Sequence, residues 1–213
     1  MLTNSVAINA LSFLLDTIFG LLVLAFLVRF FLQLTRSSFQ NQLAQTVIMV
    51  TNFAVKPMRR LLPSIRNIDV STLLLAYMSE WLLQLGLLSL RDFPVLLAGN
   101  QLWISLTGLA LIGIIKTSIY IFIGAVLIQA VISWVSPYSA VSPMLNTFTA
   151  PVLKPFRKLF TLANGLDFSP LVFTIAAQLI IISIVLPLEA YFSASLFLYA
   201  DLIQHHSLYK NMA

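Results

Sequence analysis

The sequence contains no cysteine and few charged residues, and each shortage excludes a class of protein. Without thiols the chain forms no disulfide, attaches no c-type haem and offers no thiolate to a metal ion. Only 9% of its 213 residues are charged, whereas 60% are hydrophobic, and the mean hydropathy is +0.97. A water-soluble domain of this size needs a far more charged surface. The composition therefore indicates an integral membrane protein.

Catalytic and metal-binding patterns are also missing from the sequence. Its two histidines, His205 and His206, are neighbours in a polar tail without an acidic or thiol partner nearby, so we expect neither a metal site nor Ser-His-Asp catalysis. No glycine-rich phosphate loop occurs. We therefore expect a protein without enzyme activity or cofactor. Nothing basic precedes the first apolar run, so we also expect no cleaved signal peptide.

Long apolar runs dominate what is present. A membrane-spanning helix needs about 20 mainly apolar residues, because each residue rises ~1.5 Å across a hydrocarbon core of ~30 Å. The runs do not alternate as the strands of a membrane barrel would. Four stretches are long enough: Leu14–Leu34, Val70–Leu90, Thr117–Val135 and Phe168–Pro187. The sequence predicts an all-α, polytopic membrane protein with four transmembrane helices.

Lysine and arginine gather in the segments that follow the first and the third span. These residues are Arg36, Lys56, Arg59, Arg60 and Arg66, and then Lys154, Arg157 and Lys158. Because cytoplasmic loops carry an excess of lysine and arginine, we expect both segments in the cytoplasm and both termini outside. The net charge of +5 then faces anionic lipid, and we expect no nucleic acid as a direct partner.

The chain repeats itself. The segment Lys56–Leu61 recurs as Lys154–Leu159, an offset of 98 (154 − 56), and upstream of these motifs the matching offset is 100. Each copy reads as a span, a basic segment and a second span, so the two copies share one orientation. The predicted units are residues 8–92 and 104–188, followed by an interfacial tail on the outer face, residues 189–213.

More than thirty residues separate the two spans of each unit, which is long for a plain loop. Apolar residues recur there at helical spacing: Leu43, Val47, Val50 and Ala54, and then Met144, Phe148 and Val152. We expect amphipathic helices in the cytoplasmic interface, ended by Pro57 and Pro155. A solvated connector is the alternative.

A span, then Lys-Pro-x-Arg-Arg/Lys-Leu, then Asp-x-Ser opening the next span, all present twice, resembles the YggT family (YlmG in photosynthetic lineages). The resemblance covers roughly residues 10–190. It implies a bacterial inner-membrane protein or a plastid relative. Family members are associated with osmotic or envelope stress tolerance, with cytochrome b6 assembly in plastids and with nucleoid or division organisation, without an agreed biochemical activity.

The two copies depart from the family pattern at two proline positions. The proline usual before the basic motif is Phe53 in the first unit and Pro151 in the second. The proline usual after that motif is Pro63 in the first unit and Thr161 in the second. We therefore expect the loop geometries of the two units to differ.

Four ionisable residues lie in or beside the predicted spans: Asp16, Arg29, Glu80 and Lys116. Such groups cost ~2.5–3.5 kcal/mol inside a membrane on insertion scales. Arg29 aligns with Gln129, and Glu80 aligns with Gln178. We predict that Arg29 meets Glu80 within the first unit and that Gln129 and Gln178 make the corresponding neutral hydrogen bond. In the alternative, Glu80 faces a water-filled path and Arg29 reaches the interface. Asp16 and Lys116, near the outer ends of their spans, are expected to reach headgroup water.

Two functions remain open at this point. In the first, the protein is a non-catalytic scaffold or assembly factor that oligomerises or holds another membrane protein. Its lipid- or partner-binding residues are then Lys56, Arg59, Arg60, Lys154, Arg157 and Lys158. In the second, Glu80, Gln129 and Gln178 line a path for a small solute or cation, which requires oligomers because four spans make a thin wall.

Overall fold

The computed structural model describes residues 2–37, 41–62, 68–91, 93, 99–136, 139, 141–159 and 167–196. Its helices are α1 (Leu2–Leu34), α2 (Gln42–Leu61), α3 (Val70–Leu90), α4 (Gly99–Val135), α5 (Ser142–Leu159) and α6 (Ser169–Ile180). A π-helical turn, η1 (Ile181–Val185), follows α6, and the helix then continues, so that one apolar helix covers Ser169–Leu196. Most of the predicted tail, including both histidines, lies outside the described residues.

Four helices in the described part are long and apolar enough to cross a membrane: Val6–Leu34, Val70–Leu90, Gly99–Ser133 and Ser169–Leu196. Large apolar side chains such as Leu21, Ile128 and Leu179 point outward from them and are exposed. An apolar outer surface suits a lipid environment, and helices are stable there because they satisfy their own backbone hydrogen bonds. The all-α fold with four membrane helices is confirmed.

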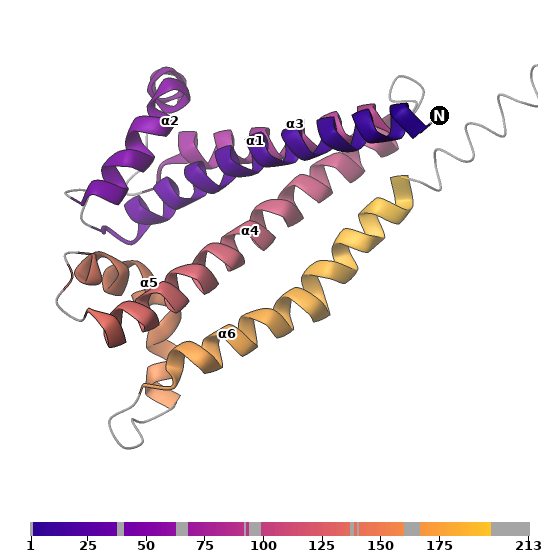
Figure 1. Cartoon of the computed structure of the whole chain (residues 1–213). Helices are drawn as coiled ribbons and strands as arrows, with labels where there is room; N and C mark the ends of the chain where they lie inside the picture. The colour runs from indigo at the N-terminus through magenta and orange to yellow at the C-terminus, as the bar shows by residue number, and fades with distance from the viewer. Residues whose placement is uncertain are drawn as a thin grey trace, which may run out of the picture.

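The two units run in the same direction. In Figure 1, α2 and α5 lie at one end of the bundle, and α1 begins at the opposite end. Helix α4 lies between the α1–α3 pair and α6 and packs against all three. The structure thus has two parallel units, each built from a long helix, a short amphipathic helix and a second long helix.

Helix α4 is longer than predicted, since it begins at Gly99 and not near Thr117. The predicted span began at Thr117, so that Lys116 lay at its outer end. In the structure Lys116 lies midway along the apolar stretch Gly99–Ser133 and forms an ion pair with Glu189. A paired charge does not have to end a membrane helix. Helix α1 likewise begins early, at Leu2.

The last helix also runs beyond its predicted end at Pro187 and reaches Leu196. Proline has no amide hydrogen for the carbonyl of Ser183, one turn before it. The helix takes its π turn just before this point, where the N–H of Leu186 donates to the carbonyl of Ile181. Such turns accommodate interruptions of the regular hydrogen-bond pattern. The continuing helix carries Glu189 toward α4.

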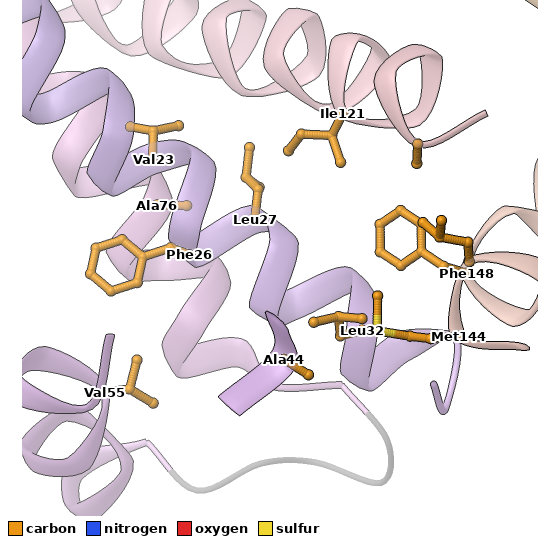
Figure 2. Close-up of a cluster of buried hydrophobic side chains, with 12 residues drawn as sticks. Val23, Phe26, Leu27, Leu32, Ala44, Val55, Ala76, Ile121, Met144 and Phe148 are labelled. Carbon is orange, nitrogen blue, oxygen red and sulfur yellow. The ribbon is translucent and has the colours of Figure 1, made fainter. Parts of the chain in front are cut away.

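One apolar core joins the two units near the end that carries α2 and α5. Figure 2 shows Phe26 and Leu27 of α1 in the same cluster as Ile121 of α4 and Phe148 of α5. The Phe122 ring of α4 lies with its centroid 5.3 Å from that of Phe148. Within lipid, close packing of this kind holds helices together by van der Waals contact.

Candidate functional site

Helix α2 turns one face to the protein and presents a mixed apolar and basic face outward. Thr51 and Val55 are buried, whereas Met49 and Phe53 are 76% and 68% exposed. Lys56, further along the exposed face, also points outward. A helix with apolar and basic residues side by side fits the boundary between lipid headgroups and hydrocarbon. The connecting segments are therefore helices, as predicted, and not solvated connectors.

The prediction that Pro57 and Pro155 end these helices is wrong. Helix α2 continues to Leu61 and α5 to Leu159. Pro57 leaves the carbonyl of Phe53 without its helical donor. Phe53 lies on the exposed face, so that carbonyl can meet water or headgroups instead. The turn after each proline is also held in place by an arginine that forms an ion pair.

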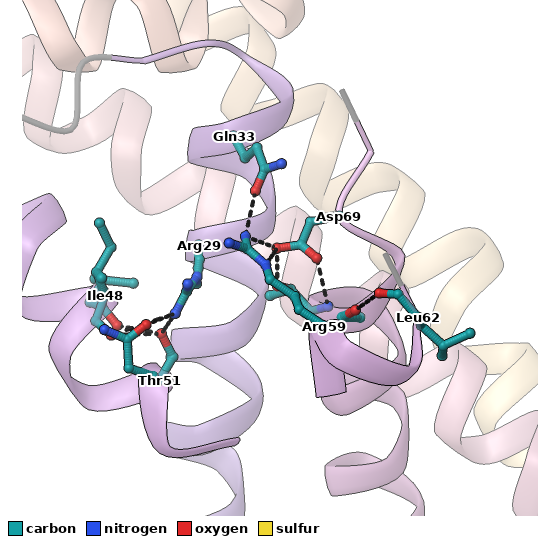
Figure 3. A network of polar contacts seen from close by, with 11 residues as sticks. Arg29, Gln33, Ile48, Thr51, Arg59, Leu62 and Asp69 are labelled. Carbon is teal, nitrogen blue, oxygen red and sulfur yellow. Dashed lines mark hydrogen bonds and ion pairs between the residues drawn. The ribbon is translucent and has the colours of Figure 1, made fainter. Parts of the chain in front are cut away.

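The first contact that docks α2 starts from Arg29, a buried residue of α1. Its Nη1 donates to the hydroxyl oxygen of Thr51 at 2.6 Å and to Oδ1 of Asn52 at 3.1 Å. A third, longer contact reaches the carbonyl of Ile48 at 3.5 Å. Figure 3 shows the guanidinium pointing into the turn of α2 that carries Ile48 and Thr51. Arg29 therefore fixes how α2 lies against α1.

The second unit repeats this contact without a charge. The hydroxyl of Thr149, on α5, donates to Oε1 of Gln129, and Nε2 of Gln129 donates to Oδ1 of Asn146 at 2.5 Å. Gln129 is the counterpart of Arg29 at the offset of 100, and Thr149 is the counterpart of Thr51 at the offset of 98. In both units, a buried threonine of the amphipathic helix is hydrogen-bonded to a long polar side chain of the preceding membrane helix.

The predicted pairs Arg29–Glu80 and Gln129–Gln178 are therefore wrong. Glu80 instead accepts a hydrogen bond from Gln84 Nε2 at 3.0 Å, and its carboxylate packs against Gly113 of α4. Gln178 is exposed on α6. The prediction considered only partners on other membrane helices. The threonines repeated at the offset of 98 were the signal that could have identified the true partners.

A second contact ties the end of α2 to the beginning of α3. Arg59 Nε donates to Asp69 Oδ2 at 3.2 Å, Nη2 forms an ion pair with the same oxygen, and Nη2 also donates to Gln33 Oε1 at 3.2 Å (Figure 3). Asp69 also caps α3, because it accepts from the hydroxyl of Thr72 at 2.6 Å and from the Thr72 backbone N–H. One buried carboxylate thus fixes both helix ends.

The second unit repeats this ion pair at the offset of 98. Arg157 Nε donates to Asp167 Oδ2 at 3.0 Å, and Asp167 Oδ1 accepts from the backbone N–H of Ser169 at the start of α6. Here both partners are partly exposed, the arginine side chain by 42% and the aspartate by 35%. The two ion pairs, Arg59–Asp69 and Arg157–Asp167, are called the interfacial ion pairs below. The hydrogen bonds of Arg29 with Thr51 and of Gln129 with Thr149 are called the threonine contacts.

Both aspartates remain ionised because of these contacts. Burial alone would raise the pKa of Asp69, but hydrogen bonds from Arg59 and Thr72, with the arginine charge, lower it below its ordinary value. Burial also acts to raise the pKa of Asp167, and hydrogen bonding from Ser169 with the charge and hydrogen bond of Arg157 outweighs it. The ion pairs are thus present at neutral pH.

The six basic residues predicted to bind lipid or a partner divide into two groups. Arg59 and Arg157 form the interfacial ion pairs. The other four are exposed at the same end of the bundle: Lys56, Arg60, Lys154 and Lys158. This second group is called the basic surface below.

A further polar contact lies inside the membrane helices of the second unit, between α4 and the helix that continues α6. Lys116 Nζ lies 2.7 Å from Oε2 and 3.0 Å from Oε1 of Glu189. The prediction that Lys116 reaches headgroup water did not consider Glu189, because the fourth span was expected to end before it. The described residues contain no group of three or more His, Cys, Asp or Glu side chains placed to hold a metal ion.

Comparison with known proteins gives one family. A model of the family described as CCB3/YggT matches residues 8–90 and again residues 108–188. The chain is 30% identical to "Uncharacterized protein YggT" of Escherichia coli (strain K12), over 85% of this chain and 93% of that protein. It is 31% identical to "Uncharacterized protein in proC 3'region" of Vibrio alginolyticus, over 80% and 90% of the two chains. No solved structure matches the chain. The twofold match confirms the resemblance and the tandem repeat.

Proposed function

The chain belongs to the CCB3/YggT family, and from this premise we propose that it is a non-catalytic scaffold or assembly factor of the bacterial inner membrane. Its task is to hold anionic lipid and another membrane protein, or further copies of itself, during osmotic or envelope stress. One observation supports the proposal most directly. Each unit uses the same threonine contact and the same ion pair to dock an amphipathic helix at one end of the bundle.

Docking of this kind suits a binding platform. An amphipathic helix attached only by a flexible linker would lose conformational entropy each time it met a partner. The threonine contacts and ion pairs remove that freedom in advance and leave the basic surface exposed. Each basic residue near an anionic membrane contributes ~1 kcal/mol, so these four residues together favour the lipid headgroup region.

Site-specific photo-crosslinking in living cells tests this role. A photoreactive amino acid at Phe53, on the exposed face of α2, should form a discrete protein adduct, whereas the same probe at Leu21, on the outside of α1, should react with lipid only. Thr51→Val should weaken the Phe53 adduct because α2 loses a docking contact. Identical products at the two positions would contradict the proposal.

The proposal includes an orientation, with the basic surface in the cytoplasm and both termini outside. Because the chain has no cysteine, single cysteines can report it. A membrane-impermeant maleimide should label Asn4→Cys and Asn211→Cys in intact cells. It should label Arg60→Cys and Lys158→Cys only after permeabilisation. Labelling of position 60 in intact cells would overturn the orientation.

An oligomeric path for a small solute or cation is the second candidate. It is favoured by one observation, the position of Glu80 and of the Lys116–Glu189 pair within the membrane helices. Purified protein in liposomes decides between the two functions. The scaffold predicts proton and potassium fluxes equal to those of protein-free liposomes. A flux faster than that of protein-free liposomes, abolished by Glu80→Gln, would favour the transport path and contradict the scaffold function.

A further inference from the structure

Arg29 carries a positive charge and has no salt bridge of its own among the described residues; the charge of Asp69 acts on it, but the Asp69 carboxylate is paired with Arg59. Arg29 is only 6% exposed, and its recorded hydrogen bonds all leave from Nη1 to neutral oxygens of α2. Among the described residues, the salt bridges are Arg59–Asp69, Lys116–Glu189 and Arg157–Asp167, and none includes Arg29. A buried charge without a direct ion-pair partner is costly as a rule. The fold therefore retains an arginine where a neutral residue would cost less.

The second unit shows that docking does not require this charge. Gln129 makes the equivalent contact with Thr149 and adds a hydrogen bond to Asn146. Glutamine is thus sufficient to hold an amphipathic helix against a membrane helix in this fold. The guanidinium of the first unit must be explained by something other than docking.

A cavity of about 530 Å³ lies beside Arg29, and its lining is rich in hydrogen-bond donors. It is formed by Arg29, Gln33, Ile48, Asn52 and Arg59. The amide oxygen of Gln33 accepts from Arg59, and that of Asn52 accepts from Arg29, so both amides keep their NH₂ groups for a ligand. In sequence alignment, the second unit has the shorter Ser133 and Ala150 where the first has Gln33 and Asn52.

We propose that this cavity binds an anionic phosphate group, held by the guanidinium groups of Arg29 and Arg59. Guanidinium groups donate two parallel hydrogen bonds to phosphate oxygens, and the NH₂ groups of Gln33 and Asn52 add further donors. A phosphate would form the direct ion pair that Arg29 does not make with any described carboxylate. The group comes either from an anionic lipid headgroup or from free phosphate. The site does not depend on the scaffold role, since a transport path could hold the same anion.

Native mass spectrometry of the purified full-length protein tests the site. We expect the wild-type protein to retain phosphatidylglycerol about tenfold better than phosphatidylcholine, a difference of ~1.4 kcal/mol. Arg29→Gln, which copies Gln129, should abolish this preference. Arg91→Gln is the matched control, because it removes an exposed charge at the end of α3, outside both the cavity and the basic surface, and should keep the preference. An Arg29→Gln protein with the wild-type preference would overturn the proposal.

Inorganic phosphate, added in a separate arm, distinguishes the two sources. If it binds the wild-type protein without lipid and displaces phosphatidylglycerol, free phosphate is the ligand. If it does neither while the lipid preference depends on Arg29, the ligand is a headgroup. A wild-type protein that retains neither probe above the Arg29→Gln background overturns the proposal.

Gln33→Glu gives an independent test that leaves both arginines in place. The new carboxylate would neutralise them from within the cavity, so the melting temperature in lipid-free detergent should rise above that of the wild type. Phosphatidylglycerol should then stabilise the wild type and not Gln33→Glu. An equal rise of melting temperature with this lipid in both proteins would show that the lipid acts elsewhere and would overturn the proposal. This comparison decides the matter even if Arg29→Gln fails to fold.

Discussion

Replacing Asp69 by asparagine removes the charge from the interfacial ion pair of the first unit while keeping the shape of the side chain. Asparagine caps helices about as well as aspartate, so the contact with the backbone of Thr72 should survive. Asp69 is fully buried, and the side chain of its partner Arg59 is 39% exposed. Breaking a fully buried ion pair costs ~3–5 kcal/mol, and breaking an exposed one costs ~0–1 kcal/mol. This half-buried pair lies between these limits, and we expect a loss of about 2 kcal/mol.

The second unit supplies the matched control for this substitution. Asp167 and Arg157 are both more than a third exposed, so Asp167→Asn should cost less than ~1 kcal/mol. The assay is unfolding in mixed micelles by increasing fractions of sodium dodecyl sulfate, followed by helical circular dichroism. An equal loss of unfolding free energy in Asp167→Asn and Asp69→Asn, or no loss in Asp69→Asn, would refute the dependence on burial.

Three further predictions concern pH, the intramembrane ion pair and a close helix contact. The pKa of Asp69 in the folded protein is lowered from 3.8, so the ionised side chain should stabilise the fold fully above pH 3.8 and lose this effect as pH falls through the lower folded pKa. The unfolding free energy of the Asp69→Asn protein, measured against pH, should lack this part of the dependence. Lys116→Met should leave Glu189 unpaired and lower the melting temperature, at a cost of ~1–2 kcal/mol of stability. Adding Glu189→Gln should restore most of the lost melting temperature. A double variant no more stable than Lys116→Met would contradict the ion pair between Lys116 and Glu189. Gly113→Ala should lower the free energy of unfolding in micelles by ~1–3 kcal/mol, because the added Cβ would lie 2.3 Å from Oε1 of Glu80. Gly124→Ala, where the added Cβ would have nothing within 4 Å, should lower it far less.

The features that could be predicted from sequence are those that composition and repetition express locally. Apolar runs of sufficient length identify membrane helices because lipid admits few other structures. The doubled motif Lys56–Leu61 and Lys154–Leu159 reveals the repeat, and helical spacing of apolar residues reveals α2 and α5. The helix boundaries were less accurate, because Lys116 and Pro187 are residues that usually end a span and here do not.

The partners of the buried polar residues could not be predicted in the same way. Arg29 and Glu80 have opposite charges and lie at neighbouring depths, so pairing them was the simplest way to neutralise both. The depth at which α2 meets α1 depends on tertiary packing, and it places Thr51 within reach of Arg29. The only sign of this polar contact in the sequence was the threonine repeated at the offset of 98, which marks Thr51 and Thr149 as candidate partners but does not by itself give the depth at which they meet α1 and α4.

Each amphipathic helix is docked by its own threonine contact, independently of the threonine contact of the other unit. Hydrogen–deuterium exchange of the full-length protein in micelles measures this directly, because undocking exposes the backbone amides of one helix. Losing one such buried hydrogen bond costs ~1–2 kcal/mol, which corresponds to exchange roughly 5- to 30-fold faster. We predict that Thr51→Val accelerates exchange in α2 and leaves α5 unchanged, and that Thr149→Val does the reverse. Unchanged exchange of α2 in Thr51→Val, or equal acceleration of α2 and α5 in either variant, would contradict the account.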